Sequence, residues 1–299
     1  MKALKPVDRV QWQAWINQAI AEAKKGNLPR YIPLLSHENP NNYALLVTRL
    51  DGEVFSSGNL LKTFPLMSVI KLFLLLYLLS QQGQEWVFGY VGKEPSDYPF
   101  NSLIQLQLDQ GFPRNPMINS GAIRLAGLLP GNTNRDRCLG LRDWLNQQGN
   151  CQLFLDEEML ASVQSRPNER NQALVREMVN HGHLNNPEQA LDTYNQICCL
   201  AGNIEDLAEL GMLLVRSLPP LKKEDCQQVQ ALMSSCGLYE ASAQFAQEIG
   251  LPTKSGVSGV FLSLIPEQGA IAIYSPPLDP QGNSVAGLYL IRKIAESLR

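Results

Sequence analysis

Residues 66–79 have the sequence LMSVIKLFLLLYLL, an apolar run of 14 residues that Ser68 and Lys71 interrupt. A helix that spans a membrane needs about 20 apolar residues, so this run is too short for that role. It predicts a buried helix, from Leu66 to Gln82, at the centre of the fold. Lys71 is unusual there, because a lysine that is merely solvated does not belong inside such a run.

Strand patterns lie on both sides of this helix. Before it, residues 43–50 (YALLVTRL) favour a strand, and Asp51-Gly52 provides a tight turn into a second strand at 53–57. Two further strands and a final helix are predicted towards the C-terminus, at 259–265, 270–274 and 284–298.

The remaining periodic segments are predicted to be helices. One begins after the capping residue Asp8 and ends near Gly26. The others lie in the middle of the chain, at 118–129, 141–148, 156–165, 171–181, 187–200, 203–217 and 222–236. Strands at both ends around a helical middle predict an α+β fold, in which helices flank an antiparallel sheet built from the N- and C-terminal strands and a helical domain is inserted.

This organisation predicts two lobes in one functional unit. We expect residues 1–65 and 237–299 to form the sheet lobe and residues 66–236 to form the helical lobe. A cleft between two lobes is a natural place for a small-molecule site. We therefore expect the functional site to lie between them.

Composition narrows the classes of function. The chain has 299 residues, 44% of them apolar, and a formal net charge of −3, which argues against a nucleic-acid partner. We find no secretory signal after Met1 and expect no membrane association. The six cysteines form no CxxC pair and there are only three histidines, so a zinc site is not expected. We expect buried, reduced thiols and a cytoplasmic protein.

Ser68 and Lys71 form an S-x-x-K pattern at the start of an apolar helix. Side chains three residues apart project from one helix face, with Cβ atoms about 5–6 Å apart. Apolar surroundings lower the pKa of an amine, so that the lysine can take the serine proton and make the hydroxyl a nucleophile. Chance alone gives about one S-x-x-K in a chain of this length, so the pattern needs support from other residues.

The segment Lys254-Ser255-Gly256 precedes an apolar strand. A Lys-Ser-Gly triplet at an edge strand accompanies S-x-x-K in serine acyl-enzymes. The backbone N–H of Val257 is then placed to complete an oxyanion hole with that of Ser68. The alternative is a glycine-rich turn that enters a hairpin.

Other polar residues have a structural alternative of comparable weight. Asn119 either presents its amide to a polar substrate or caps a helix. Tyr194 and Tyr239 are candidate acid–base or hydrogen-bonding groups, although most tyrosines are half-buried packing residues. His181 and His183 lie in a polar stretch typical of a helix terminus.

Several segments match a known family in their order and spacing. They are Tyr31-Ile32-Pro33, Phe64 to Lys71 (FPLMSVIK), Glu94-Pro95-Ser96 with Phe100-Asn101-Ser102, Pro113 to Ile123 (PRNPMINSGAI), Arg170-Asn171, Ala190-Leu191-Asp192 with Tyr194, Cys236 to Tyr239 (CGLY), and Lys254 to Gly259 (KSGVSG). Each match alone is weak evidence, but the probability that all of them arise by chance in this order is the product of small probabilities. From about Gly26 to its C-terminus the chain resembles the serine-dependent glutaminase family, within the superfamily of β-lactamases and penicillin-binding proteins.

The resemblance implies a β-lactamase-like fold and the hydrolysis of L-glutamine to L-glutamate and ammonia. It implies that Ser68 is the nucleophile and that Lys71 is the base that activates it, with Tyr194 and Tyr239 assisting proton transfer. The residues implied in substrate binding are Tyr31, Asn119, Asn171 and the backbone of Val257. The resemblance implies no metal or organic cofactor. It implies that the protein forms a homodimer or homotetramer.

One position departs from the family pattern. The family has a glutamate that binds the substrate's α-ammonium seven residues before the asparagine of the Arg-Asn pair, and this chain has Gln164 there. A neutral amide lacks the charge-assisted part of that interaction, at a cost of about 1–3 kcal/mol. Glu157, Glu158 and Glu169 are nearby in sequence as substitutes. We expect Gln164 to contact the substrate and Gln164→Glu to lower the KM for glutamine.

Two other functions stay open at this point. One is a serine acyl-enzyme of the same fold that acts on another amide or ester, such as a β-lactam, which Gln164 favours if the substrate has no α-ammonium. The other is a homologue that binds a ligand without turnover. The presence of Ser68, Lys71, Tyr239 and the Lys-Ser-Gly segment argues against the latter.

Overall fold

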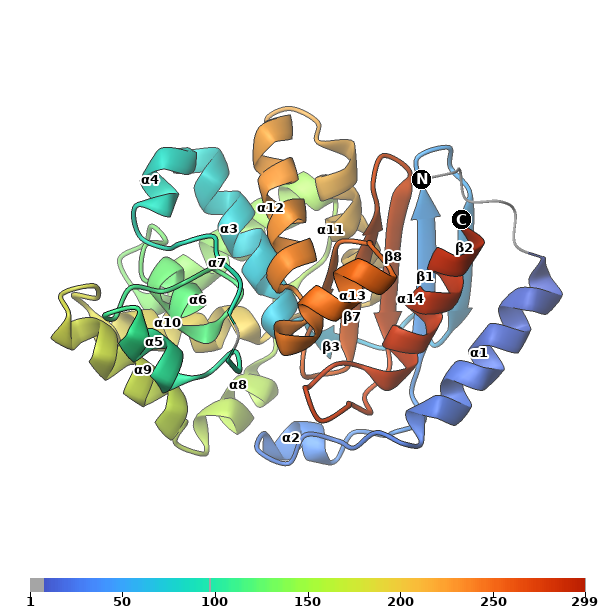
Figure 1. The fold of residues 1–299 in the computed structure, drawn as a ribbon, viewed down its shortest axis with the longest axis horizontal. Coiled ribbons are helices and arrows are strands. Elements are labelled where there is room, and N and C mark those ends of the chain that lie inside the picture. Colours follow the sequence, from blue (N-terminus) through green and yellow to red (C-terminus); the bar gives the residue numbers. More distant parts are fainter. Residues whose placement is uncertain (1–7, 97, 299) are drawn as a thin grey trace.

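The structure, a computed structural model that describes residues 8–96 and 98–298, is built around a five-stranded antiparallel sheet (Figure 1). In order across the sheet, the strands are β2 (Val54–Gly58), β1 (Ala44–Arg49), β8 (Gly269–Tyr274), β7 (Val260–Ile265) and β6 (Thr253–Ser255). The N-terminal and C-terminal hairpins join through β1 and β8, where Ala44 pairs with Tyr274. The predicted α+β fold, with an antiparallel sheet built from both ends of the chain, is confirmed.

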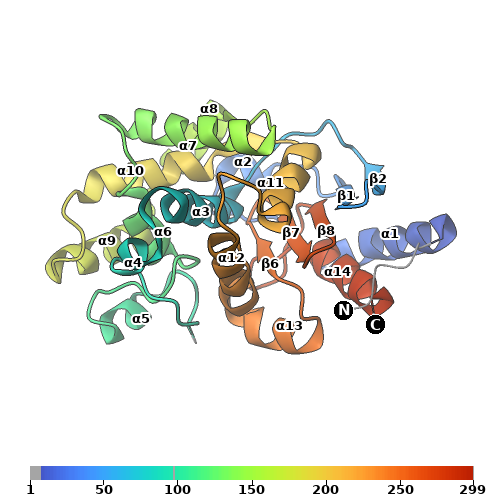
Figure 2. The same ribbon diagram turned by 90° about the horizontal axis from the view of Figure 1, so that it is seen from above.

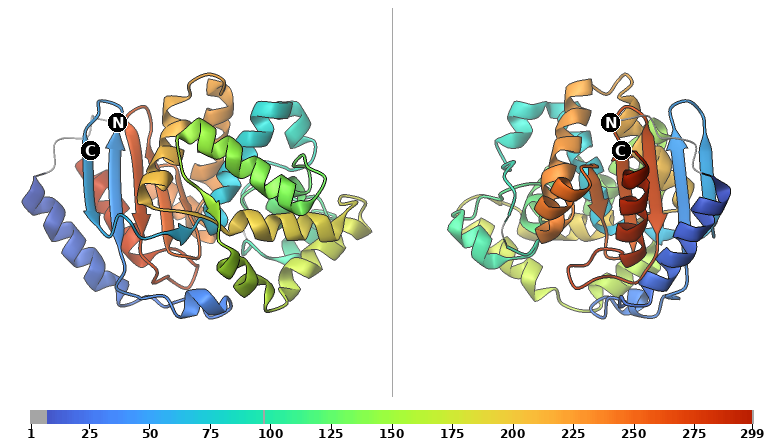
Figure 3. Two further views of the ribbon diagram at one scale, coloured as in Figure 1. Left: turned by 180° about the vertical axis from the view of Figure 1, so that it is seen from behind. Right: turned by 45° about the vertical axis from the view of Figure 1, so that its right-hand side comes forward.

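One face of the sheet is covered by the two terminal helices. α1 (Arg9–Ala23) and α14 (Val285–Ser297) lie side by side on this face, as the right-hand view of Figure 3 shows. Phe261 and Ile273 are buried beneath them, while their neighbours along each strand point to the opposite face. This alternation explains why β7 and β8 are buried along their whole length, because both faces of the sheet are covered there.

The other face of the sheet is covered by α11 (Ile204–Arg216). Gly211 of this helix lies against Leu262 and Ala270, and a Cβ at position 211 would come within 2.8 Å of both side chains. Figure 2 shows α11 between the sheet and the helical part of the molecule, where it also contacts α7. Because α11 is shared in this way, the division of the chain at residues 65 and 236 stays a prediction.

The helical part contains the segments predicted in the middle of the chain. It comprises α3 (Ile70–Gln82), α4 (Gln84–Phe88), α5 (Leu103–Leu108), α6 (Asn119–Ala126), α7 (Asn134–Gly149), α8 (Glu157–Gln164), α9 (Glu169–Asn180), α10 (Pro187–Cys198) and α12 (Lys223–Cys236). α2 (Pro33–Ser36) contacts α8, and α13 (Ser242–Glu248) contacts α12. His181 is the C-cap of α9, so the prediction of a helix terminus there is confirmed.

Several boundaries differ from the predicted ones. The helix predicted from Leu66 begins as a 3₁₀ turn, Met67–Val69, before α3. α7 begins at Asn134 rather than 141, because Thr133 and Asp136 form a capping box. A second sheet of three short strands, in the order β3 (Phe64–Pro65), β5 (Leu200–Gly202) and β4 (Phe154–Leu155), was not predicted, since two- and three-residue strands carry no periodic signal.

Within residues 8–96 and 98–298, no helix has the length and apolar character needed to cross a membrane. All six cysteines are buried and free, as the sequence predicted. The apolar run at 66–79 is the core of the helical part: Leu72 to Leu76 have no exposed surface.

Candidate active site

Ser68 lies at a sharp turn between β3 and α3. Leu66 donates its backbone N–H to Leu200 O at 2.8 Å, which fixes the chain immediately before the turn. Met67 has a φ of +45°, a left-handed conformation that is costly for a residue with a side chain. Ser68 follows within the 3₁₀ turn and is 7% exposed. Strain of this kind is often found where a fold must present one side chain in one direction.

Lys71 lies in the first turn of α3 and is fully buried. Its Nζ donates hydrogen bonds to Met117 O at 3.1 Å and to Asn119 Oδ1 at 2.7 Å. Burial lowers the pKa of this amine to about 8. A neutral amine has two hydrogens and one lone pair, so these two acceptors leave the lone pair unused. Lys71 therefore has the properties of a base at neutral to mildly alkaline pH.

Asn119 connects the helices around Lys71. It is the first residue of α6, and its Oδ1 also accepts from Tyr194 Oη at 3.1 Å. Its Nδ2 donates to Asn171 Oδ1, at 2.9 Å, on α9. The N-cap of α6 is Ile118, so the alternative interpretation of Asn119 as a helix cap is wrong.

Asn115 was missed by the sequence analysis, although it lies in the segment that carried the resemblance. It is fully buried, and its Oδ1 accepts from the backbone N–H groups of Met117 and Ile118. These bonds hold the loop whose Met117 carbonyl accepts from Lys71. A side chain that bonds only to backbone has no pairing signal in the sequence.

Lys254 lies on β6, which contacts the turn that carries Ser68, and Tyr239 lies in the 3₁₀ turn Tyr239–Ala241 between α12 and α13. The Tyr239 hydroxyl donates a hydrogen bond to Ser255 O at 3.4 Å and lies near the Ser68 side chain. Lys254 Nζ donates to Gly237 O at 2.9 Å and to Ser255 O at 2.8 Å, and it lies 4.2 Å from the centroid of the Tyr239 ring. Burial lowers the pKa of Lys254 well below its usual value and raises that of Tyr239 to about 12. Tyr239 has a φ of +59°, so it too is in a left-handed conformation.

Tyr194 and Cys198 complete the buried part of the cluster. They are one turn apart on α10, and their side chains are near enough for each to affect the pKa of the other. Burial raises the pKa of the Tyr194 hydroxyl well above its usual value and that of the Cys198 thiol to about 11. Lys71 Nζ lies 5.7 Å from the centroid of the Tyr194 ring. The sequence analysis did not single out Cys198.

Tyr31 and Val257 lie at the edge of this cluster. Tyr31 precedes α2 and is 55% exposed. Partial burial of its phenol and, to a smaller extent, the nearby Tyr239 raise the pKa of Tyr31. Val257 follows Gly256 in the connection between β6 and β7. A Cβ at Gly256 would come within 2.8 Å of Leu66 O, so this connection packs against the turn that carries Ser68.

Gln164 is not joined to the cluster. It is the last residue of α8, is exposed, and donates from Nε2 to Asp192 Oδ1 at 2.9 Å. Asp192 Oδ2 accepts from Asn134 Nδ2 at 2.7 Å and from Gln196 Nε2 at 2.8 Å. Three neutral amides therefore surround the Asp192 carboxylate.

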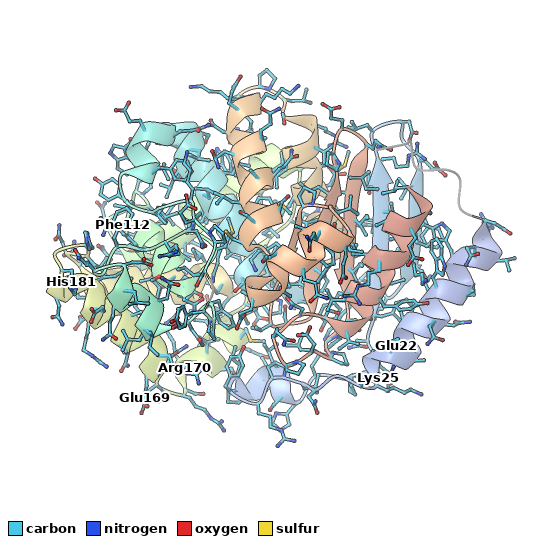
Figure 4. All side chains as sticks on the ribbon, in the orientation of Figure 1. Glu22, Lys25, Phe112, Glu169, Arg170 and His181 are labelled. Atoms are coloured by element: carbon cyan, nitrogen blue, oxygen red, sulfur yellow. The ribbon has the colours of Figure 1, made fainter. Side chains whose placement is uncertain are left out.

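The three glutamates considered as substitutes for an acid at position 164 are all exposed. Glu157 pairs with Arg135, which lowers the pKa of the Glu157 carboxyl. Glu169 lies with Arg170 on the outer surface in Figure 4. Among residues 8–96 and 98–298, no group of three or more His, Cys, Asp or Glu side chains is arranged to hold a metal ion.

Gly237 is the point where α12 meets β6. A Cβ there would lie 1.8 Å from Thr253 O and 2.4 Å from Met233 O, so Gly237→Ala must displace backbone. We expect this substitution to lower the free energy of unfolding by about 1–3 kcal/mol. Gly140→Ala is the matched control, because its Cβ meets nothing within 4 Å inside α7 and should add about 0.5–1 kcal/mol. Urea unfolding measures both, and equal stability of the two variants would contradict the prediction.

Comparisons with known proteins cover both parts of the fold. The family model for glutaminase matches residues 26–299. A glutaminase from Synechocystis sp. is 46% identical over 288 residues, which are 96% of this chain and 88% of that protein. A Bacillus glutaminase whose structure was determined in 4.3 M NaCl superposes with a TM-score of 0.87 at 28% identity, over 96% of this chain and 97% of that one.

A further structure shows a reacted protein. It is the covalent complex between the Bacillus subtilis glutaminase YbgJ and 5-oxo-L-norleucine, formed by reaction with 6-diazo-5-oxo-L-norleucine. It superposes with a TM-score of 0.86 at 26% identity, over 97% of each chain. The predicted β-lactamase-like fold class is confirmed by these likenesses.

Proposed function

The chain belongs to the glutaminase family, and from this premise we propose that it hydrolyses L-glutamine to L-glutamate and ammonia with Ser68 as the nucleophile. The observation that carries the assignment of Ser68 is the cluster around it. A fully buried Lys71, three residues after Ser68, has both of its neutral-state hydrogens accepted, and the connection after β6 packs against the turn that carries Ser68.

In the first half of the reaction, the Ser68 hydroxyl attacks the side-chain carboxamide carbon of glutamine. The Ser68 proton passes to the neutral Lys71 amine, and Tyr239 is assigned an assisting role in this transfer. The new C–O bond gives a tetrahedral intermediate, and its oxyanion accepts from the backbone N–H groups of Ser68 and Val257. The C–N bond then breaks, and the protonated amine returns its proton to the departing ammonia.

In the second half, a water molecule attacks the acyl-enzyme ester. Lys71 takes one proton from this water, and the bond to Ser68 Oγ breaks as the serine recovers a proton. Asn119 and Asn171, which hydrogen-bond each other, supply amide groups that bind the substrate's polar atoms. Tyr31, which is partly exposed, contributes its hydroxyl to substrate binding from the solvent side. Tyr194 holds Asn119 and so keeps this arrangement fixed.

The test of this function is a screen of amides for ammonia release by the purified chain. We expect L-glutamine to be hydrolysed faster than L-asparagine and than 4-carbamoylbutanoate, which lacks the α-ammonium. Turnover of a chromogenic cephalosporin without turnover of glutamine would instead support a β-lactam-directed acyl-enzyme. Neither turnover nor acylation of Ser68 would support a homologue that only binds.

The α-ammonium subsite includes Gln164 in this proposal. The Asp192 carboxylate holds Gln164 Nε2, which leaves Oε1 as the acceptor for the substrate's ammonium. A carboxylate introduced at position 164 would lie beside that of Asp192, and like charges at this distance repel. The expected effect of Gln164→Glu is therefore smaller than the one predicted from the sequence.

We expect Gln164→Glu to leave the KM for glutamine within about threefold, because the new charge is opposed by Asp192. Gln164→Glu combined with Asp192→Asn should lower the KM about tenfold, which corresponds to one charge-assisted hydrogen bond. The KM for 4-carbamoylbutanoate should not change in either variant. A tenfold decrease with Gln164→Glu alone would contradict the role given to Asp192.

The family resemblance also supports a cytoplasmic protein that forms a homodimer or homotetramer. Sedimentation velocity at the concentration of the assay distinguishes these assemblies from a monomer.

The same resemblance supports one catalytic unit formed by a sheet lobe and a helical lobe. Limited proteolysis that releases residues 66–236 as a folded fragment would support this division.

A further inference from the structure

Asn283 lies in the segment between β8 and α14 and has no exposed surface. Its Oδ1 accepts a hydrogen bond from Ser255 Oγ at 2.6 Å, on the edge strand β6. Its Nδ2 is buried and has no hydrogen-bond partner within the described part of the chain. An asparagine that served stability alone would be expected to have both ends of its amide satisfied.

The backbone of Asn283 is held by hydrogen bonds with Asp279. Asp279 Oδ1 accepts from the N–H groups of Gln281 at 3.0 Å and Asn283 at 2.8 Å, and Asp279 donates its own N–H to Asn283 O at 2.8 Å. Ser284 donates to Ser275 O at 2.9 Å and caps α14. The side chain of Asn283 is therefore held in a defined direction, towards β6.

β6 needs such a support because it is short and lies at the edge of the sheet. It has three residues and pairs only with β7, so one side of Ser255 has no neighbouring strand. The Ser255 carbonyl nevertheless has to be held in place, since it accepts from Lys254 Nζ at 2.8 Å and from Tyr239 Oη at 3.4 Å. Asn283 holds the Ser255 side chain in addition to this pairing.

The same segment also lies near Val257, the second residue after β6. A Cβ at Gly282 would lie 3.7 Å from Val257 Cγ1, an ordinary van der Waals distance. Residues 282 and 283 thus lie against Val257 and Ser255. The proposed mechanism uses the Val257 N–H, and the Ser255 carbonyl accepts from Tyr239 Oη.

We propose that Asn283 is a positioning residue for the reaction, which acts through Ser255 to hold the Tyr239 hydroxyl and the Val257 amide in register with Ser68. The inference rests on the proposed function. Loss of the Asn283–Ser255 hydrogen bond lets β6 move away from Ser68, so the chemical step slows while substrate binding, which uses Asn119 and Asn171, changes little.

The test compares Asn283→Ala, Ser255→Ala and the double variant in full-length protein. We expect each single variant to lower kcat at least tenfold while the KM for glutamine stays within threefold. Both variants break the same hydrogen bond, so the double variant should lose no more than threefold beyond the larger single loss. If Asn283→Ala does not fold, Ser255→Ala breaks this bond from the other side and carries the test.

Asn146→Ala is the matched control. Asn146 also clamps a loop with its amide, through Leu153 N and Leu153 O, but on α7 of the helical part. It should lower stability and leave kcat within twofold. A folded Asn283→Ala with kcat within twofold of wild type, or losses that multiply in the double variant, would overturn the inference.

The reaction of Ser68 with 6-diazo-5-oxo-L-norleucine separates this inference from the proposed function. If wild type reacts but does not hydrolyse glutamine, the proposed function fails, and slower labelling of Asn283→Ala still supports the positioning role. If wild type hydrolyses glutamine and Asn283→Ala does so equally fast, the positioning role fails alone.

Discussion

Ser68→Ala should lower ammonia release from L-glutamine by at least about 10³-fold, because it removes the oxygen that forms the acyl-enzyme. The fold should be retained. The Tyr239 hydroxyl keeps an acceptor in Ser255 O, so no buried donor is orphaned by the substitution. We expect the free energy of unfolding to change by no more than about 1 kcal/mol.

Ser263→Ala is the control for Ser68→Ala. Ser263 is fully buried on β7, and its hydroxyl pairs with Thr253 Oγ1 at 2.8 Å, away from the cluster around Lys71. This variant should lose stability and retain kcat within a few-fold. Steady-state ammonia release with both variants decides the prediction. Ser68→Ala with more than a tenth of wild-type activity would exclude Ser68 as the nucleophile.

Lys71→Met should lower kcat/KM by about 10³-fold without unfolding the protein. Methionine matches the length of the lysine side chain, and the position is surrounded by the apolar residues of α3. Asn119 Oδ1 keeps its hydrogen bond from Tyr194, so the substitution leaves only Met117 O without its donor. Kinetics and urea unfolding of the same preparation separate loss of catalysis from loss of fold.

The pH dependence of wild type should follow the same amine. Neutral Lys71 is the reactive form, so kcat/KM should rise with pH up to about 8 and then level off. For stability, the unfolded chain binds more protons between pH 8 and the ordinary lysine value of 10.5, so stability contributed by this group rises with pH in that window. The rise amounts to about 3 kcal/mol and should be absent from Lys71→Met. Equal pH profiles of stability in the two proteins would contradict a lowered Lys71 pKa.

The parts of the fold that the sequence predicts are those with strong local signals. The Asp51-Gly52 turn defines the N-terminal hairpin, the two apolar segments of β7 and β8 define the C-terminal one, and the apolar run at 66–79 defines α3. The small β3–β5–β4 sheet has no such signal, because its strands are held by pairing between distant segments. The place of α11 against the sheet also depends on tertiary packing at Gly211.

The candidate site was predictable where one segment carries two chemical groups, as with Ser68 and Lys71. Contacts between segments were not predictable from spacing alone. The bond from Lys71 to Asn119 joins residues 48 apart, and that from Ser255 to Asn283 joins residues 28 apart. The hydrogen bond from Gln164 to Asp192 also joins distant segments. It changes the expected effect of Gln164→Glu, which the sequence alone predicts to lower the KM for glutamine.

The most direct test of Ser68 as the nucleophile is to label the protein with 6-diazo-5-oxo-L-norleucine and to locate the adduct by peptide mass spectrometry. We predict one adduct, on Ser68, that forms faster as the pH rises towards 8 and that is lost in Ser68→Ala. Labelling that stays the same in Ser68→Ala, or an adduct on Cys198 or Tyr239 in wild type, would show that Ser68 is not the nucleophile.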